Sequence, residues 1–141
     1  MDMNEPKPVP FVWQVRVYWE DTDGGGVVYH SNYLKFFERA RTEWLRARGV
    51  HQSALEVTEN LVFAIRHMAV DWIAPARLDD LLDISVHSVN ASAARLTFTQ
   101  AMHRAADGVE LARAEVTAVS LDAKRFKPKK MPEWIRTEIN K

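Results

Sequence analysis

Apolar positions recur with two different periods along the chain, and the change of period predicts its elements. Between residues 31 and 48 they recur every three or four positions, which places them on one face of a helix roughly 25 Å long. This apolar face consists of Tyr33, Phe36, Phe37, Ala40, Trp44, Leu45 and Ala47. Ser31 is the predicted N-cap of the helix, and Gly49 is its predicted C′ residue.

Two arginines interrupt the apolar face of this helix. Arg41 and Arg48 both fall within it, so each must find a partner or extend its long side chain toward solvent. Glu38 lies one turn before Arg41 and is the predicted partner of that guanidinium.

Outside the helix the apolar period is two, which is typical of strands with one face on a core. A first strand is predicted from residue 11 to residue 19. Four more follow the helix, at residues 63–72, 82–87, 95–103 and 112–119, and Asp107-Gly108 predicts a turn between the last two. Residues 51–60 fit no single period. The order of one strand, one long helix and four strands predicts an α+β domain with the helix packed on an antiparallel sheet.

Length, charge and cysteine content exclude several classes of protein. The 141 residues suit one domain, predicted from residue 11 to residue 141, after a flexible N-terminal arm at 1–10 that carries three prolines. Nineteen basic and nineteen acidic residues cancel, which argues against a nucleic-acid partner. With no cysteine there are no disulfides or thiolate metal sites. No apolar run reaches the length of a membrane span and no signal core is present, so a soluble, cytoplasmic protein is expected.

The unusual chemistry is concentrated in the segment DTDGGGVVYHSNY, residues 21–33. It places carboxylates in a glycine-rich turn just before a helix N-terminus, where free backbone N–H groups and the helix dipole stabilise negative charge. Such donors can receive the oxyanion of an acyl transfer while a carboxylate attacks or activates water. The alternative is that Asp21 and Asp23 only form the turn. The five histidines lack a zinc-binding spacing, so neither a metal nor another cofactor is expected.

The stretch from Arg16 to Leu34 resembles the signature of the 4-hydroxybenzoyl-CoA thioesterase family. The matching positions, in order and spacing, are Thr22-Asp23, Gly26-Val27-Val28, His30 and Tyr33-Leu34. The likeness continues through residues 36–46, 75–82, 96–100 and 127–132. It is strongest to the branch of acyl-CoA thioesterases associated with the bacterial Tol–Pal system.

This resemblance implies a single-domain hotdog fold, in which a curved antiparallel sheet wraps around one long helix. It also implies homodimers joined sheet edge to sheet edge, or homotetramers, with active sites between subunits. The catalytic carboxylate of the family falls on Asp23, as nucleophile or general base, and its oxyanion donor falls on the backbone N–H of His30. Tyr29 directly precedes His30 and is expected to border the substrate, whereas Asp21 is expected to shape the turn.

The expected activity is hydrolysis of an acyl-CoA, with acyl carrier protein as another possible carrier of the acyl group and CoA as part of the substrate. Residues 91–93, Ala-Ser-Ala, replace a basic triplet that grips CoA phosphates in the 4-hydroxybenzoyl enzyme, so that substrate is not expected. Basic residues gather instead at positions 124–130, either as a phosphate contact or as a solvated turn. Two alternatives stay open: a hydratase or dehydratase on the same scaffold, and a non-catalytic adaptor that binds an acyl carrier or a membrane.

Overall fold

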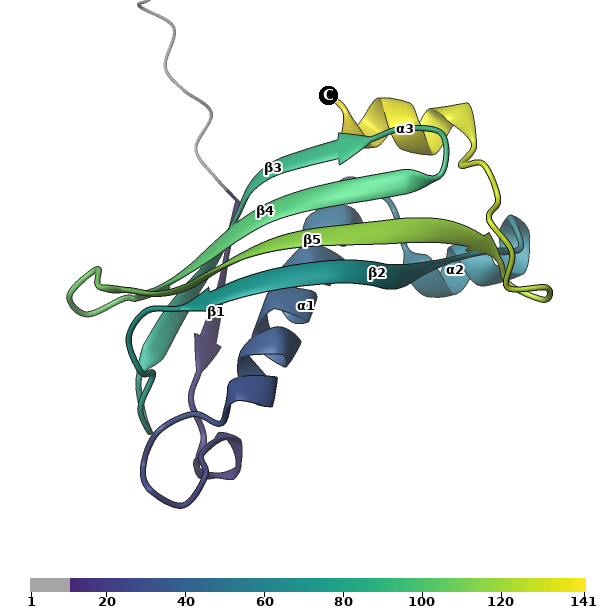
Figure 1. The fold of residues 1–141 in the computed structure, drawn as a ribbon. Helices are drawn as coiled ribbons and strands as arrows, with labels where there is room; N and C mark the ends of the chain where they lie inside the picture. The colour runs from purple at the N-terminus through teal and green to yellow at the C-terminus, as the bar shows by residue number, and fades with distance from the viewer. Residues whose placement is uncertain (1–10) are drawn as a thin grey trace, which may run out of the picture.

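The computed structural model describes residues 11–141, so the predicted arm at 1–10 lies outside the described residues. Its centre is one five-stranded antiparallel sheet in the order β1-β3-β4-β5-β2 (Figure 1). The strands are β1 (Phe11–Arg16), β2 (Leu61–Trp72), β3 (Leu81–Ala91), β4 (Arg95–Arg104) and β5 (Glu110–Asp122). Irregular pairing within β2, β3 and β5 marks bulges, which bend a sheet.

The long helix α1 (His30–Ala47) lies along the concave face of the curved sheet (Figure 1). Two short helices, α2 (Gln52–Thr58) and α3 (Glu133–Ile139), lie beyond one end of α1. α3 is tied to the sheet by Asn140, whose side chain hydrogen-bonds both the N–H and the C=O of Ala91 at 2.8 and 2.9 Å. The predicted α+β hotdog architecture is confirmed.

The core lies between α1 and the sheet, on the faces that the periodicity predicted. Phe36 and Phe37 of α1 are almost fully buried, as are the alternate residues of β3 and β4 that face them. β5 contributes small side chains, including Ala112, Ala114 and Ala118, which let the helix approach the sheet closely. The period-two alternation therefore identified the inward face of these strands correctly.

The predicted helix start at Ser31 is wrong, whereas the predicted end is confirmed. Tyr29 takes the N-cap position in an extended conformation, no side-chain hydrogen bond caps the helix, and Ser31 lies inside its first turn. The reason is a backbone contact: the Tyr29 N–H donates to the Asp21 carbonyl at 3.1 Å, and the chain turns into the helix directly afterwards. Gly49 follows the C-cap residue with φ of +78°, a left-handed conformation that favours glycine.

Two further predictions are wrong: the end of the first strand and the partner of Arg41. The first strand ends at Arg16, three residues early, because residues 19–21 form a short 3-10 turn. Glu38 is exposed and is not the hydrogen-bond partner of Arg41; the guanidinium instead donates through Nη1 to Oε1 of Gln100 on β4 at 3.1 Å. The local spacing suggested a neighbour on the helix, but Arg41 turns into the core and meets the sheet. The unassigned stretch 51–60 contains α2.

Candidate active site

The loop between β1 and α1 is closed on itself by backbone hydrogen bonds. Thr22 and Val28 form an isolated antiparallel bridge, and the Asp23 N–H donates to the Val27 carbonyl at 3.0 Å. Gly24 and Gly26 have φ of +89° and +85°, which side-chain-bearing residues adopt only with strain. The glycines thus allow a tight reversal that returns the chain from Asp23 to the start of α1.

The two aspartates of this loop have different surroundings. Asp21 is a structural residue: its Oδ2 accepts the Tyr18 N–H at 2.8 Å, and its carbonyl accepts the side-chain amide of Asn32 at 2.8 Å. Asp23 is exposed, and its Oδ1 accepts the Gly25 N–H at 2.8 Å. Its Oδ2 makes no hydrogen bond to any residue of the range 11–141. Asp23 therefore presents one oxygen that a substrate or a water can use.

His30 is the first residue of α1, so its backbone N–H is one of the donors that a helix leaves unpaired. Within the described range this N–H has no hydrogen-bond acceptor. The imidazole faces other rings: its centroid lies 6.4 Å from that of Tyr29 and 5.1 Å from that of Trp72, at the end of β2. A hollow of about 250 Å³ adjoins His30 and Trp72. His30 thus lines a small depression, and the ring of Tyr29 lies beside its imidazole.

Trp72 also lies beside His30, and no pattern in the sequence predicted this contact. It lies far from His30 along the chain and ends β2, which forms the opposite edge of the sheet from β1. Only the curvature of the sheet around α1 brings the two side chains into contact.

The segment between β2 and β3 is hydrogen-bonded to α1 and to the loop that carries Asp23. The buried hydroxyl of Tyr33 on α1 accepts the N–H of Ala76 at 2.9 Å, and the carbonyl of Ala76 accepts the N–H of Val28 at 2.9 Å. The Gly26 carbonyl accepts the N–H of Leu78 at 3.1 Å. Three hydrogen bonds therefore join residues 26–33 to residues 76–78.

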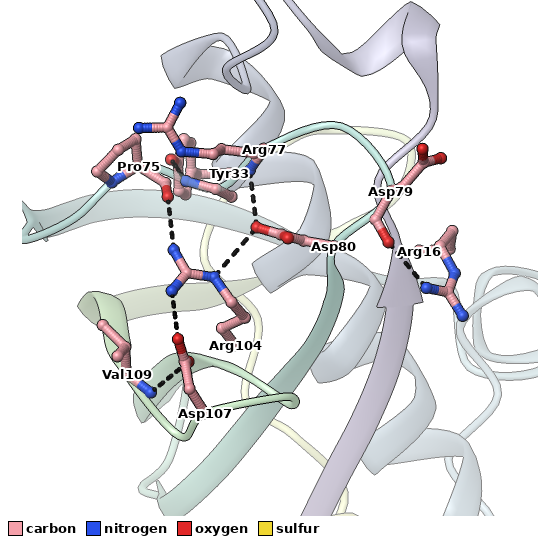
Figure 2. A network of polar contacts seen from close by, with 10 residues as sticks. Arg16, Tyr33, Pro75, Arg77, Asp79, Asp80, Arg104, Asp107 and Val109 are labelled. Atoms are coloured by element: carbon pink, nitrogen blue, oxygen red, sulfur yellow. Dashed lines mark hydrogen bonds and ion pairs between the residues drawn. The ribbon is translucent and has the colours of Figure 1, made fainter.

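Arg104 ties this supporting segment to the β4–β5 hairpin (Figure 2). Its guanidinium donates to Asp80 at 3.2 Å, to Asp107 at 2.7 Å and to the carbonyl of Pro75 at 3.2 Å. The Val109 N–H and then the Arg104 guanidinium hold the pKa of Asp107 below its usual value, and Asp107 and Asp80 raise the pKa of Arg104. The site loop is thus anchored, through the 75–80 segment, to a hairpin remote in sequence.

A second and larger cavity, of about 410 Å³, lies between α1 and the sheet. It begins at Leu34, one helical turn after His30, and its walls are mostly apolar side chains from α1, β2 and β4. Polar side chains also line it, namely Lys35, Glu38, Arg41, Thr42 and Gln52, and Arg41 is the one among these that is buried, at 6% exposed. The sequence did not predict this cavity, although it did show an arginine inside the apolar face of the helix, and this arginine lines the cavity.

The basic cluster at 124–130 is partly structural. The ammonium of Lys129 donates to the backbone carbonyls of Glu59 and Asn60, and the carboxylate of Asp122 accepts the N–H groups of Lys124 and Arg125. Lys129 thus stabilises the turn after β5, while the neighbouring basic side chains are exposed. Across residues 11–141, no group of three or more His, Asp or Glu side chains is arranged to hold a metal ion.

A curved sheet around one long helix, with a carboxylate loop leading into that helix, defines a hotdog-fold protein of the thioesterase type. The chain belongs to the thioesterase-like superfamily, whose family model matches residues 17–139. The predicted family and the predicted thioesterase class are confirmed. In residues 11–141 no helix is both long and apolar enough to cross a lipid bilayer.

Particular relatives narrow this class. The chain is 46% identical over 129 residues to the acyl-CoA thioester hydrolase YbgC of Escherichia coli O6:H1, covering 92% of this chain and 95% of that protein. It is 40% identical over 130 residues to the acyl-CoA thioesterase YbgC of Haemophilus influenzae, covering 92% and 94%. The crystal structure of a 1,4-dihydroxy-2-naphthoyl-CoA thioesterase from Synechocystis is similar with a TM-score of 0.84 and 27% identity, covering 94% and 96% of the two chains.

Proposed function

We propose that the protein hydrolyses acyl-CoA thioesters to a free acid and CoA, with Asp23 as the catalytic carboxylate. The observation that carries this proposal is the loop closed by Thr22 and Val28, which leaves a carboxylate oxygen of Asp23 exposed and leads into α1, where the N–H of His30 has no acceptor among the described residues. The relatives named as acyl-CoA thioester hydrolases support the choice of substrate class.

In the proposed reaction the thioester carbonyl accepts a hydrogen bond from the His30 N–H. The positive end of the α1 dipole and this donor stabilise the oxyanion as it forms. Asp23 then acts in one of two ways. As a nucleophile it attacks the carbonyl carbon and expels the CoA thiolate, leaving a mixed anhydride that water hydrolyses; as a general base it removes a proton from the attacking water.

Other groups complete the proposed site. The exposed ring of Tyr29 borders the bound thioester, and the His30 imidazole, held between two aromatic rings, keeps the helix start in place. CoA enters as part of the substrate, so the reaction needs no separate cofactor. The protein would meet this substrate in the cytoplasm, and acyl carrier protein is a second carrier to test.

The proposed assembly is a homodimer, with pairing of dimers into a homotetramer as its extension. Among the described strands β2 pairs only with β5, so its other edge offers backbone donors and acceptors to a second copy. Ile65 and Trp72 of β2 are about half exposed and would be covered there. Light scattering on purified protein measures the mass, and a monomer at micromolar concentration would contradict this assembly.

Thiol release from a panel of acyl-CoAs and acylated carrier protein tests the proposed activity. Asp23→Asn should lower kcat by roughly 10²–10⁴-fold, because the amide can neither attack nor remove a proton at useful rates. Glu20→Gln is the matched control, since Glu20 is an exposed carboxylate in the same turn, and should stay near wild type. Absence of thiol release by the wild type, or full activity of a folded Asp23→Asn, would contradict the proposal.

The two roles of Asp23 are separated by a single turnover in oxygen-18 water. Label found in the Asp23 carboxylate requires the anhydride route, because water then attacks a carbonyl that includes an aspartate oxygen. Label found only in the released acid is the pattern of the general-base route and equally of an anhydride that water attacks at the acyl carbon, so only label in Asp23 decides between the roles.

A further inference from the structure

The guanidinium of Arg41 is buried, and it forms no ion pair with a carboxylate of residues 11–141. Its exposed fraction is 6%, and its one hydrogen bond among residues 11–141 is to the neutral side chain of Gln100. Gln100 is itself committed, because its amide donates to the Phe37 carbonyl at 3.0 Å. The remaining contact of Arg41 is with the ring of Phe98, 6.0 Å from the guanidinium carbon. Burial lowers the pKa of Arg41 to about 10, so the group is charged at neutral pH.

An isolated buried charge is costly, and a carboxylate is the group that compensates a guanidinium best, through paired hydrogen bonds. The carboxylate nearest in sequence, Glu38, lines the same cavity and acts against the lowering of the Arg41 pKa, but it forms no ion pair with Arg41, so the buried charge is compensated only in part. Arg41 also borders the cavity of about 410 Å³ along α1, so an occupant of that cavity can reach it.

The cavity lies in line with the proposed active site. On α1, His30 is followed by Leu34 one turn later and by Arg41 roughly 16 Å along the axis. On β2, Trp72 contacts His30, while Met68 lies four residues earlier on the same face and lines the cavity. The helix and the strand therefore each run from the hollow at His30 to the cavity that Arg41 lines. Helical side chains lean toward the N-terminus, which brings the guanidinium back toward His30.

We propose that this cavity receives the acyl part of the substrate, and that Arg41 binds a carboxylate at the far end of an otherwise apolar acyl chain. The substrate class is thus the CoA thioesters of dicarboxylic acids of medium length. Apolar walls hold the methylene groups, and the buried guanidinium supplies both charge and two donors at the end of the path. Arg41 is a specificity residue and takes no part in bond breaking. This inference rests on the proposed thioesterase function.

The experiment compares matched pairs of substrates that differ only at the far end of the chain: adipoyl-CoA with hexanoyl-CoA, and sebacoyl-CoA with decanoyl-CoA. The readout is the ratio of kcat/KM within each pair, which cancels a general loss of active enzyme. Arg41→Met should lower the dicarboxylate ratio roughly ten- to hundredfold, the range of one charge-assisted hydrogen bond. Arg41→Lys should retain part of it. Arg39→Met is the matched control, because Arg39 is an exposed arginine on the same helix and lies outside this cavity.

An unchanged ratio in a folded Arg41→Met would overturn the inference while leaving the thioesterase function in place. If no substrate releases thiol, the proposed function fails, and binding of the corresponding non-hydrolysable thioether analogues to wild type and to Arg41→Lys decides the inference separately. Equal affinity of the wild type for the carboxyl-ended and methyl-ended analogues would overturn it. Tighter binding of the carboxyl-ended analogue, reduced in Arg41→Lys, would support it. The same binding comparison applies if Arg41→Met does not fold.

Discussion

The start of α1 and its middle differ in solvent exposure and in the groups that hold them in place. At the start, the loop that carries Asp23 is exposed, polar and held by backbone hydrogen bonds, so its carboxylate can change partners without disturbing the core. In the middle, Arg41 is enclosed by apolar side chains and held by one amide. Exposed reactive groups and the buried groups that stabilise the fold therefore lie at different places along the helix. Substitutions at the start should act on rate, and those in the middle should act on folding as well.

The largest expected effect on stability is in the middle of α1, at the contact between Arg41 and Gln100. Gln100→Leu removes the hydrogen-bond acceptor of Arg41 and leaves a buried guanidinium alone, at a cost of about 3 kcal/mol in the free energy of unfolding. Urea unfolding followed by circular dichroism measures this. The double variant Arg41→Met with Gln100→Leu should recover much of the loss, because no buried charge remains.

The matched control for this prediction is Gln14→Leu. Gln14 is exposed and hydrogen-bonds Asp83 at 2.8 Å, so its replacement should change the free energy of unfolding by well under about 1 kcal/mol. If the double variant Arg41→Met with Gln100→Leu is as unstable as Gln100→Leu alone, then an unpaired buried charge is not the cause of the instability, and this explanation is contradicted.

An intermediate effect is expected at the boundary between the two regions. Tyr33→Phe removes the hydroxyl that accepts the buried N–H of Ala76, and leaving that donor unsatisfied costs about 1–3 kcal/mol. Because Ala76 also holds Val28, kcat should fall together with stability. Thermal unfolding and thiol release on the same preparation measure both. Loss of stability without loss of kcat would break the link between this segment and the site.

The smallest effect is expected at the hairpin. Since the pKa of Asp107 is lower in the folded state, its contribution to stability is complete above the ordinary aspartate pKa and disappears as the pH falls below it. Asp107→Asn should therefore reduce the loss of stability between neutral and acid pH by a small amount. Asp71→Asn, at an exposed strand residue, is the control. Equal acid profiles for wild type and Asp107→Asn would contradict the lowered pKa.

The sequence predicted the elements better than their contacts. Period and spacing were sufficient for α1, for the inward faces of β3 to β5 and for the position of Asp23 before a helix. They failed where a contact joins distant parts of the chain. Arg41 pairs with Gln100, 59 residues away, and His30 meets Trp72 only because the sheet curves around α1. The N-cap at Ser31 failed because a backbone bond to Asp21 set the helix start, which no side-chain preference records.

The anchoring of Arg104 has a consequence for engineering the protein. The tip of the β4–β5 hairpin, at Asp107-Gly108, is exposed and resembles a convenient place to insert a peptide tag. Yet Asp107 and Arg104 connect it to the segment that fixes the loop around Asp23, so a tag inserted there would disturb the candidate active site. The C-terminus after α3 is the safer position for a tag, because Asn140 anchors that helix to Ala91 in β3, away from this network.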